Sequence, residues 1–227
     1  MDEKNQNNKF QLLKSEQCST VDELLDKSQP CPAYYLLLVL SSLIIGCGLI
    51  LTNAAIVIGG MIITPVLTPL ISIALGISVG KIQLLKHVSF FLLKSFLIIV
   101  LGGLILAFIF GQPASGFIFE NTAGTAVLYF IVALASGAAA SFAWAKKDVS
   151  DILPGIAISV AVVPPLSLVG IGLSALDSNI TRFYFLVFLL NTLGVIIGGL
   201  VTFSLLKFHK VEKKIDQEIK NNYMKKK

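Results

Sequence analysis

Six long apolar segments, separated by short polar connections, dominate this chain. They are Tyr34–Leu51, Ala54–Val79, Val88–Phe110, Thr125–Ala145, Gly155–Leu176 and Phe183–Leu206. Each is long enough to cross the hydrocarbon core of a bilayer, which takes roughly 20 apolar residues in a helix. Because backbone polar groups in lipid must be bonded internally, each segment is predicted to be an α-helix. The sequence therefore predicts an all-α integral membrane protein with six transmembrane helices.

The distribution of charge fits this fold class. Only 14% of the residues are charged, against about 25% in a soluble domain. The net charge of +5 arises largely from lysines that follow Leu206, where cytoplasmic flanks carry basic residues that attract anionic lipid headgroups. We therefore expect the lipid bilayer and anionic headgroups at the C-terminal tail as partners, and no nucleic acid. No metal-ligand spacing and no nucleophile–base pair is present, so neither an enzyme nor a cofactor is expected.

Lysine and arginine also set the orientation. With both termini in the cytoplasm, the basic residues of the tails and of the connections at 81–87 and 146–154 lie inside, and only Arg182 lies outside. The opposite orientation reverses this bias, which contradicts the positive-inside rule. We expect a multi-pass protein of the cell (plasma or inner) membrane with N-terminus and C-terminus in the cytoplasm.

The chain matches itself when it is shifted by 96 residues (59 onto 155). The matching pairs include glycines and prolines, whose positions are structurally specific: Gly59 and Gly155, Pro69 and Pro165, Gly76 and Gly172, Gly102 and Gly198, and Gly103 and Gly199. Val66 also matches Val162. Each repeat holds three spans, an odd number, so the second copy is expected to be inverted in the membrane.

These features divide the chain into five parts. They are a cytoplasmic N-terminal tail with a short interfacial helix (1–32), a first three-helix repeat (33–111), an external loop (112–124), a second three-helix repeat (125–208) and a basic cytoplasmic C-terminal helix or tail (209–227). Thr20 and Glu23 have the spacing of a capping box, which places the interfacial helix at about Val21–Ser28. Asn53 is expected to cap the second span.

Prolines occur near the middle of the second and fifth spans, at corresponding places in the two repeats. Proline removes a backbone hydrogen bond and disfavours helix at the residue before it, so both helices are predicted to be broken or kinked. Two interrupted helices at equivalent positions indicate a binding site near the bilayer midplane. The half-helix N-termini there would favour an anion. The candidate site residues are Thr64, Pro65, Thr68, Pro69, Pro164, Pro165, Ser167 and Asn191.

Several features of the sequence are compatible with either a structural or a functional role. The prolines are also compatible with simple kinks, and Thr64, Thr68 and Ser72 with helix packing instead of a polar lining. Asn191 is suited either to a structural hydrogen bond or to a ligand. Lys94 is expected to extend to the cytoplasmic interface, with a functional role as the alternative. The glycines of the spans, Gly59, Gly137 and Gly198 among them, are expected to permit close helix contact.

Three segments resemble one known family. They are IGGMIITPVLTPLISIALG, LPGIAISVAVVPPLSLVGIGL and FLLNTLGVIIGG, and the likeness extends over about Asp22–Phe208. The chain is similar to domain-of-unknown-function family 389, an uncharacterised hydrophobic membrane domain. The resemblance implies a prokaryotic multi-pass membrane protein and supplies no substrate. Many members carry a longer soluble N-terminal region than the short tail present here.

Taken together, the sequence favours a transporter or channel that moves a small solute or ion across the membrane as a homo-oligomer. The alternative is a non-transporting oligomeric scaffold or assembly protein, whose glycine-rich faces pack against other subunits.

Overall fold

The computed structural model describes residues 14–80, 82–111, 123–146 and 162–208, and this part of the chain is entirely helical. The helices, in chain order, are α2 (Lys14–Lys27), α3 (Pro32–Ile50), α4 (Ala54–Ile63), α5 (Leu67–Val79), α6 (Ile82–Phe110), α7 (Ala123–Ala145), α9 (Val163–Ser174) and α10 (Ser178–Leu205). The all-α prediction is therefore confirmed for the described residues. The predicted external loop, the first part of the fifth span and the C-terminal tail lie largely or wholly outside them.

Within these residues, four helices are long and apolar enough to cross a membrane: α3, α6, α7 and α10. A fifth span results if α4 and α5 count as one, because these two helices follow each other with a bend of 55°. α9 has 12 residues and is shorter than a span. The described chain thus holds four or five of the six predicted spans.

Two connections between helices are built alike. Asn53 accepts hydrogen bonds from the amides of the first turn of α4, at 3.0 and 3.3 Å, which confirms the predicted cap. Asp177 caps α10 in the same way, at 2.9 and 3.1 Å. The residues before these caps, Thr52 and Leu176, both have a positive φ (51° and 56°). In both connections, this left-handed residue lets the chain change direction within the three residues that separate the two helices.

Two predicted connections turn out to be helix. The polar segments 81–87 and 177–182 were expected to be short connections between spans, but α6 begins at Ile82 and α10 begins at Ser178. The apolar pattern marks only the part of a helix that meets lipid, whereas helical hydrogen bonding continues through polar residues. The carboxylate cap of Asp177 explains why α10 starts five residues before its apolar segment.

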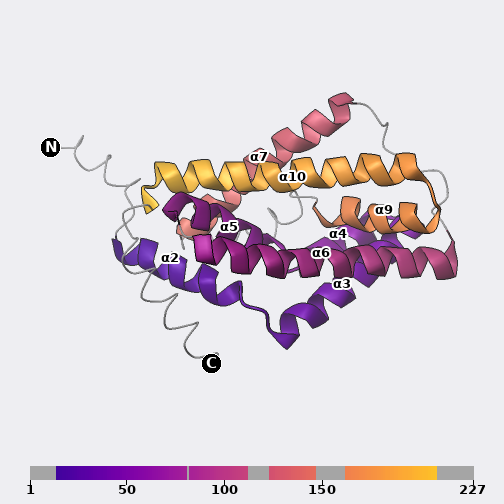
Figure 1. Ribbon diagram of the computed structural model, residues 1–227, viewed down its shortest axis with the longest axis horizontal. Helices are drawn as coiled ribbons and strands as arrows, with labels where there is room; N and C mark the ends of the chain where they lie inside the picture. The colour runs from indigo at the N-terminus through magenta and orange to yellow at the C-terminus, as the bar shows by residue number, and fades with distance from the viewer. Residues whose placement is uncertain (1–13, 81, 112–122, 147–161, 209–227) are drawn as a thin grey trace.

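Two long helices form the frame of the bundle. α6 and α10 run in opposite directions, and α9 packs against both of them (Figure 1). α5 also packs against α6 and α10, while α7 lies along α10 and α3 along α6. The buried apolar side chains of these helices form one continuous core.

Glycines allow the closest of these contacts. A Cβ atom on Gly137 of α7 would collide with the carbonyl oxygen of Val195, and one on Gly198 of α10 with that of Leu134. The expected role in close helix contact is thus confirmed at these positions. It is wrong for Gly59, whose Cβ position has no atom of another described segment within 4 Å.

α2 is longer than predicted and packs against α5 and α7. It begins at Lys14, so Thr20 lies inside the helix instead of capping it, and its hydroxyl donates to the Trp144 carbonyl at 3.2 Å. Gln17 similarly donates to the Leu206 carbonyl at 2.9 Å. The buried face that contains these residues, with Val21 and Leu24, stabilises the helical turns before Val21, which local sequence signals do not indicate.

Ser72 joins α2 to α5, and its loss is expected to release α2. Its hydroxyl lies 2.6 Å from that of Ser28 and 3.2 Å from the Leu24 carbonyl. We expect Ser72→Ala to lower the free energy of unfolding by about 1–3 kcal/mol, because buried partners lose their hydrogen bonds. Trypsin should then cut faster at Lys27. Ser174→Ala is the matched control, since the Ser174 hydroxyl donates to Ile171 within its own helix; equal proteolysis of the two variants would contradict the prediction.

Candidate functional site at the break between α4 and α5

The break between α4 and α5 lies at Thr64–Val66. Thr64 has an extended backbone (φ −70°, ψ 121°), which is the conformation that a following proline favours. Its amide donates to the Met61 carbonyl at 3.3 Å instead of to Gly60. The Thr64 hydroxyl bonds to the Gly60 carbonyl at 2.9 Å. Thr64 therefore ends α4 with its backbone and replaces the missing helical hydrogen bond with its side chain.

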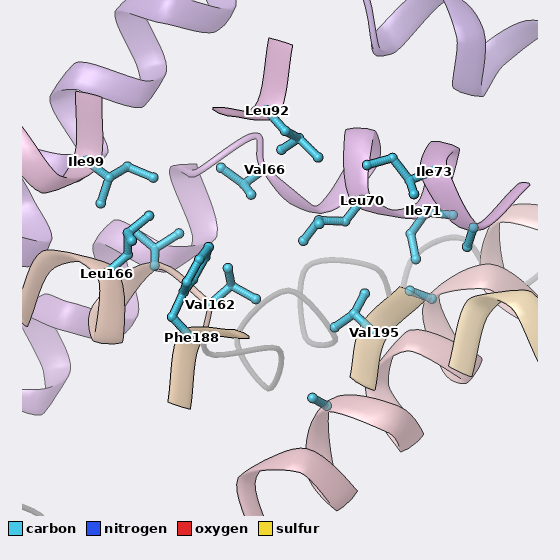
Figure 2. Packing of buried hydrophobic residues seen from close by; sticks show 14 of the residues in the cluster. Val66, Leu70, Ile71, Ile73, Leu92, Ile99, Val162, Leu166, Phe188 and Val195 are labelled. Carbon is cyan, nitrogen blue, oxygen red and sulfur yellow. The ribbon is translucent and has the colours of Figure 1, made fainter. Parts of the chain in front are cut away.

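A pocket lies at this break. Its cavity volume is about 20 Å³, and it is partly open to the surroundings; this is room for about one water molecule. It is lined by Met61, Thr64, Val66, Leu67, Leu70, Val162 and Val163. Thr64 is buried and, among the described residues, contributes the only hydroxyl to this lining. Figure 2 shows Val66 and Leu70 from the α5 side, with Val162 and Leu166 at the start of α9. The second and fifth apolar segments thus meet at one pocket.

The first residues of α5 and α9 both face this pocket. The residues that precede the two helices, Val66 and Val162, form no side-chain hydrogen bond to the helix end. The first amide groups of a helix have no partner within it. In α9, Val163 supplies the amide among the first three residues, because Pro164 and Pro165 carry no N–H. The N-terminal end of a helix also carries a partial positive charge. The pocket therefore combines apolar walls with two helix ends whose polarity favours a negatively charged group.

The prolines of these segments have two different positions. Pro65 lies in the break, whereas Pro69 lies in the first turn of α5 and Pro164 and Pro165 lie in the first turn of α9. A proline there costs little, because the amide that it lacks would have no helical partner. Pro69 and Pro165 are buried, while Pro65 and Pro164 are half-buried.

Among the sequence-predicted site residues, only Thr64 lines the pocket. Thr68 is half-buried, and its carbonyl accepts a hydrogen bond from Ser72 at 3.1 Å. Ser167 is fully buried on α9, with no hydrogen-bond partner for its hydroxyl within the described residues. Asn191 is buried on α10. Thr64, Thr68 and Ser72 do not share one helix face, since the break separates Thr64 from α5 and Ser72 faces α2.

The apolar lining residues were missed by sequence reasoning that searched for polar groups. One signal in the sequence does identify two pairs of them. Val66 and Leu67 correspond to Val162 and Val163 under the shift of 96 residues, and all four line the pocket. The pocket therefore lies where equivalent positions of the two repeats come together.

Helices of this length and composition, several of them consecutive, are those of a multi-pass membrane protein. The model of the family described as "domain of unknown function (DUF389)" matches residues 61–197, and the chain belongs to this family. It is also 27% identical over 175 residues to a protein of Methanocaldococcus jannaschii that is described as uncharacterized. That match covers 74% of this chain and 52% of the relative, so the chain spans about half the relative's length. No solved structure matches.

Proposed function

We propose that this protein is a transporter or channel for a small solute or ion, with an anion favoured, and that the pocket is its binding site. The observation that carries the proposal is the meeting of two helix N-termini at one pocket, neither of them capped by a side chain of the described residues. Such convergence of half-helices is the arrangement that secondary transporters use for binding near the midplane. The backbone amides would hold the solute, and the apolar walls would limit leakage.

The proposal includes two inverted three-helix repeats, which the packing supports. α6, the third span of the first repeat, packs on α9 of the second; α10, the third span of the second repeat, packs on α5 of the first. A Cβ atom on Gly103 would collide with the backbone of Ser167 on α9, and one on its equivalent Gly199 would meet Ala74 on α5 and Ser141 on α7. Positive φ values also recur at equivalent positions, at Gly80 (73°) and Leu176 (56°).

The proposed orientation gives a prediction for chemical labelling. In a variant whose native cysteines are replaced by serine, we expect Ser178→Cys to react with a membrane-impermeant thiol reagent in intact cells. Lys86→Cys should react only after permeabilisation, because the positive-inside rule places it in the cytoplasm. Both positions are exposed. The reverse labelling pattern would contradict the orientation.

Transport itself is tested by reconstitution into vesicles loaded with a panel of small anions, cations and neutral solutes. We expect saturable flux of at least one small anion and no comparable flux in vesicles without protein. Flux of cations alone would overturn the preference for an anion. No flux with any class of solute would overturn the transport proposal.

The second candidate function is a non-transporting membrane scaffold that assembles as an oligomer. It is favoured by the mainly apolar pocket lining and by the glycine contacts that pack α7 closely on α10. A homo-oligomer in the plasma or inner membrane is proposed under both functions. A scaffold predicts an oligomer of fixed size without solute flux, whereas the transport proposal requires flux.

A further inference from the structure

A lysine lies on the outward face of α6 among apolar side chains. Lys94 is exposed, and exposed apolar residues surround it at helical spacing: Phe90, Leu93, Leu97, Leu101 and Ile105. Residues three and four apart share one face of a helix. In a membrane-spanning helix this face meets lipid, where an ammonium group without an anionic partner is costly.

The depth of Lys94 follows from its neighbours. The adjacent Ser95 lies 3.1 Å from the hydroxyl of Tyr34, in the first turn of α3. Lys94 is therefore level with the start of α3, near the end of the bundle where α2 packs. Its Nζ lies 4.6 Å from the centre of the Phe90 ring, one turn closer to that end. The ammonium group is thus directed towards the headgroup layer while its stem remains on the apolar face.

The fold does not require a charge at this position. The equivalent residue of the second repeat is Leu190, and the exposed stripe recurs there with apolar residues at Leu186, Leu189, Leu193 and Ile197. Lys27 and Glu23 form an ion pair, and no ion pair between described residues involves Lys94. The positive charge of Lys94 is therefore available to interact with an anionic group that is not among the described residues.

We propose that Lys94 binds the phosphate of an anionic phospholipid, one acyl chain of which lies along Leu97, Leu101 and Ile105. The ammonium group supplies hydrogen-bond donors and charge to the phosphate. Lys86, exposed two turns nearer the start of α6, adds positive potential. The proposal rests on the membrane placement of α6 and not on transport.

Native mass spectrometry of the delipidated protein tests this, with phosphatidylglycerol, phosphatidylcholine or inorganic phosphate added. We expect the protein to retain phosphatidylglycerol in preference to phosphatidylcholine and not to retain phosphate. Lys94→Gln should weaken retention of phosphatidylglycerol about fivefold, the effect of one basic residue at an anionic surface. Lys94→Arg should restore it. Arg182→Gln is the matched control: this exposed cation stands at the Lys86-equivalent position of α10, and its loss should leave retention unchanged.

Three results would contradict the proposed phospholipid site at Lys94. One is equal retention of phosphatidylglycerol by wild type and Lys94→Gln, and another is equal retention of the two lipids by wild type. The third is an equal loss in Arg182→Gln and Lys94→Gln, which would indicate general charge attraction. Because Lys94 is exposed, these substitutions leave the packing intact. Solute flux by Lys94→Gln in neutral-lipid vesicles should equal that of wild type, which separates this site from the proposed pocket.

Discussion

Gly198→Ala is expected to be among the most destabilising single substitutions in this protein. The new methyl group would collide with the carbonyl oxygen of Leu134, and it would lie 2.8 Å from the amide nitrogen of Ala138. These are backbone atoms of α7, so no side-chain rotation relieves the contact. Overpacking at such a site costs about 3 kcal/mol or more, which corresponds to a fall in melting temperature of roughly 6–12 °C for a chain of this size.

Thermal unfolding in detergent measures this effect, and Gly59→Ala provides the matched control. Gly59 lies inside α4 with nothing of another segment within 4 Å of its Cβ position. Alanine there should be neutral or stabilise by about 0.5–1 kcal/mol, since glycine is the poorer helix former. Similar melting temperatures for the two variants would mean that α7 and α10 are not packed through Gly198.

Val162→Trp is expected to lower solute flux by about tenfold or more, because the indole ring would occupy the pocket and enlarge its apolar barrier. Val162 is buried and lines the pocket beside Val66 and Val163. Val66→Trp, at the equivalent position of the first repeat, should have the same effect. The measurement is the initial rate of flux in vesicles that contain equal amounts of folded protein.

Ile58→Trp is the control for this prediction. Ile58 lies on α4 like Met61 of the pocket, but its side chain is exposed on the outside of the bundle. Solute flux through the Ile58→Trp variant should equal that of wild type. If Val162→Trp and Val66→Trp keep their melting temperature and also keep full flux, the pocket is not on the permeation path.

The sequence was sufficient to predict the long apolar helices, because a segment long and apolar enough to span a bilayer is also one that forms a helix. α3 and α7 begin and end within two residues of their predicted bounds. The Asn53 cap was also predictable, since capping depends on local side-chain chemistry. Residues 82–87 and 178–182 were assigned to connections although they are helical, because hydropathy does not register a helix that continues beyond its apolar segment.

Tertiary contacts determine the features that were missed. α2 is helical ahead of Val21 because its buried face bonds to α7 and to the end of α10, partners that lie far away in the sequence. The pocket walls are apolar, so a search for polar residues identified Thr64 and overlooked Val66 and Val162. Sequence reasoning located the break in the second span, since proline acts on the residue directly before it. Which residues face the resulting space depends on how α5 and α9 approach each other.

The most direct test of the proposed path is whether water reaches the two equivalent valines. Val66→Cys and Val162→Cys, each in a background with serine at Cys18, Cys31 and Cys47, are treated in intact membranes with a small water-soluble thiol reagent. We expect both cysteines to react, and Ile58→Cys on the lipid-facing side to remain unmodified. If both pocket cysteines are as unreactive as Ile58→Cys in every condition of solute and membrane potential, the pocket is a sealed packing defect and the transport proposal is wrong.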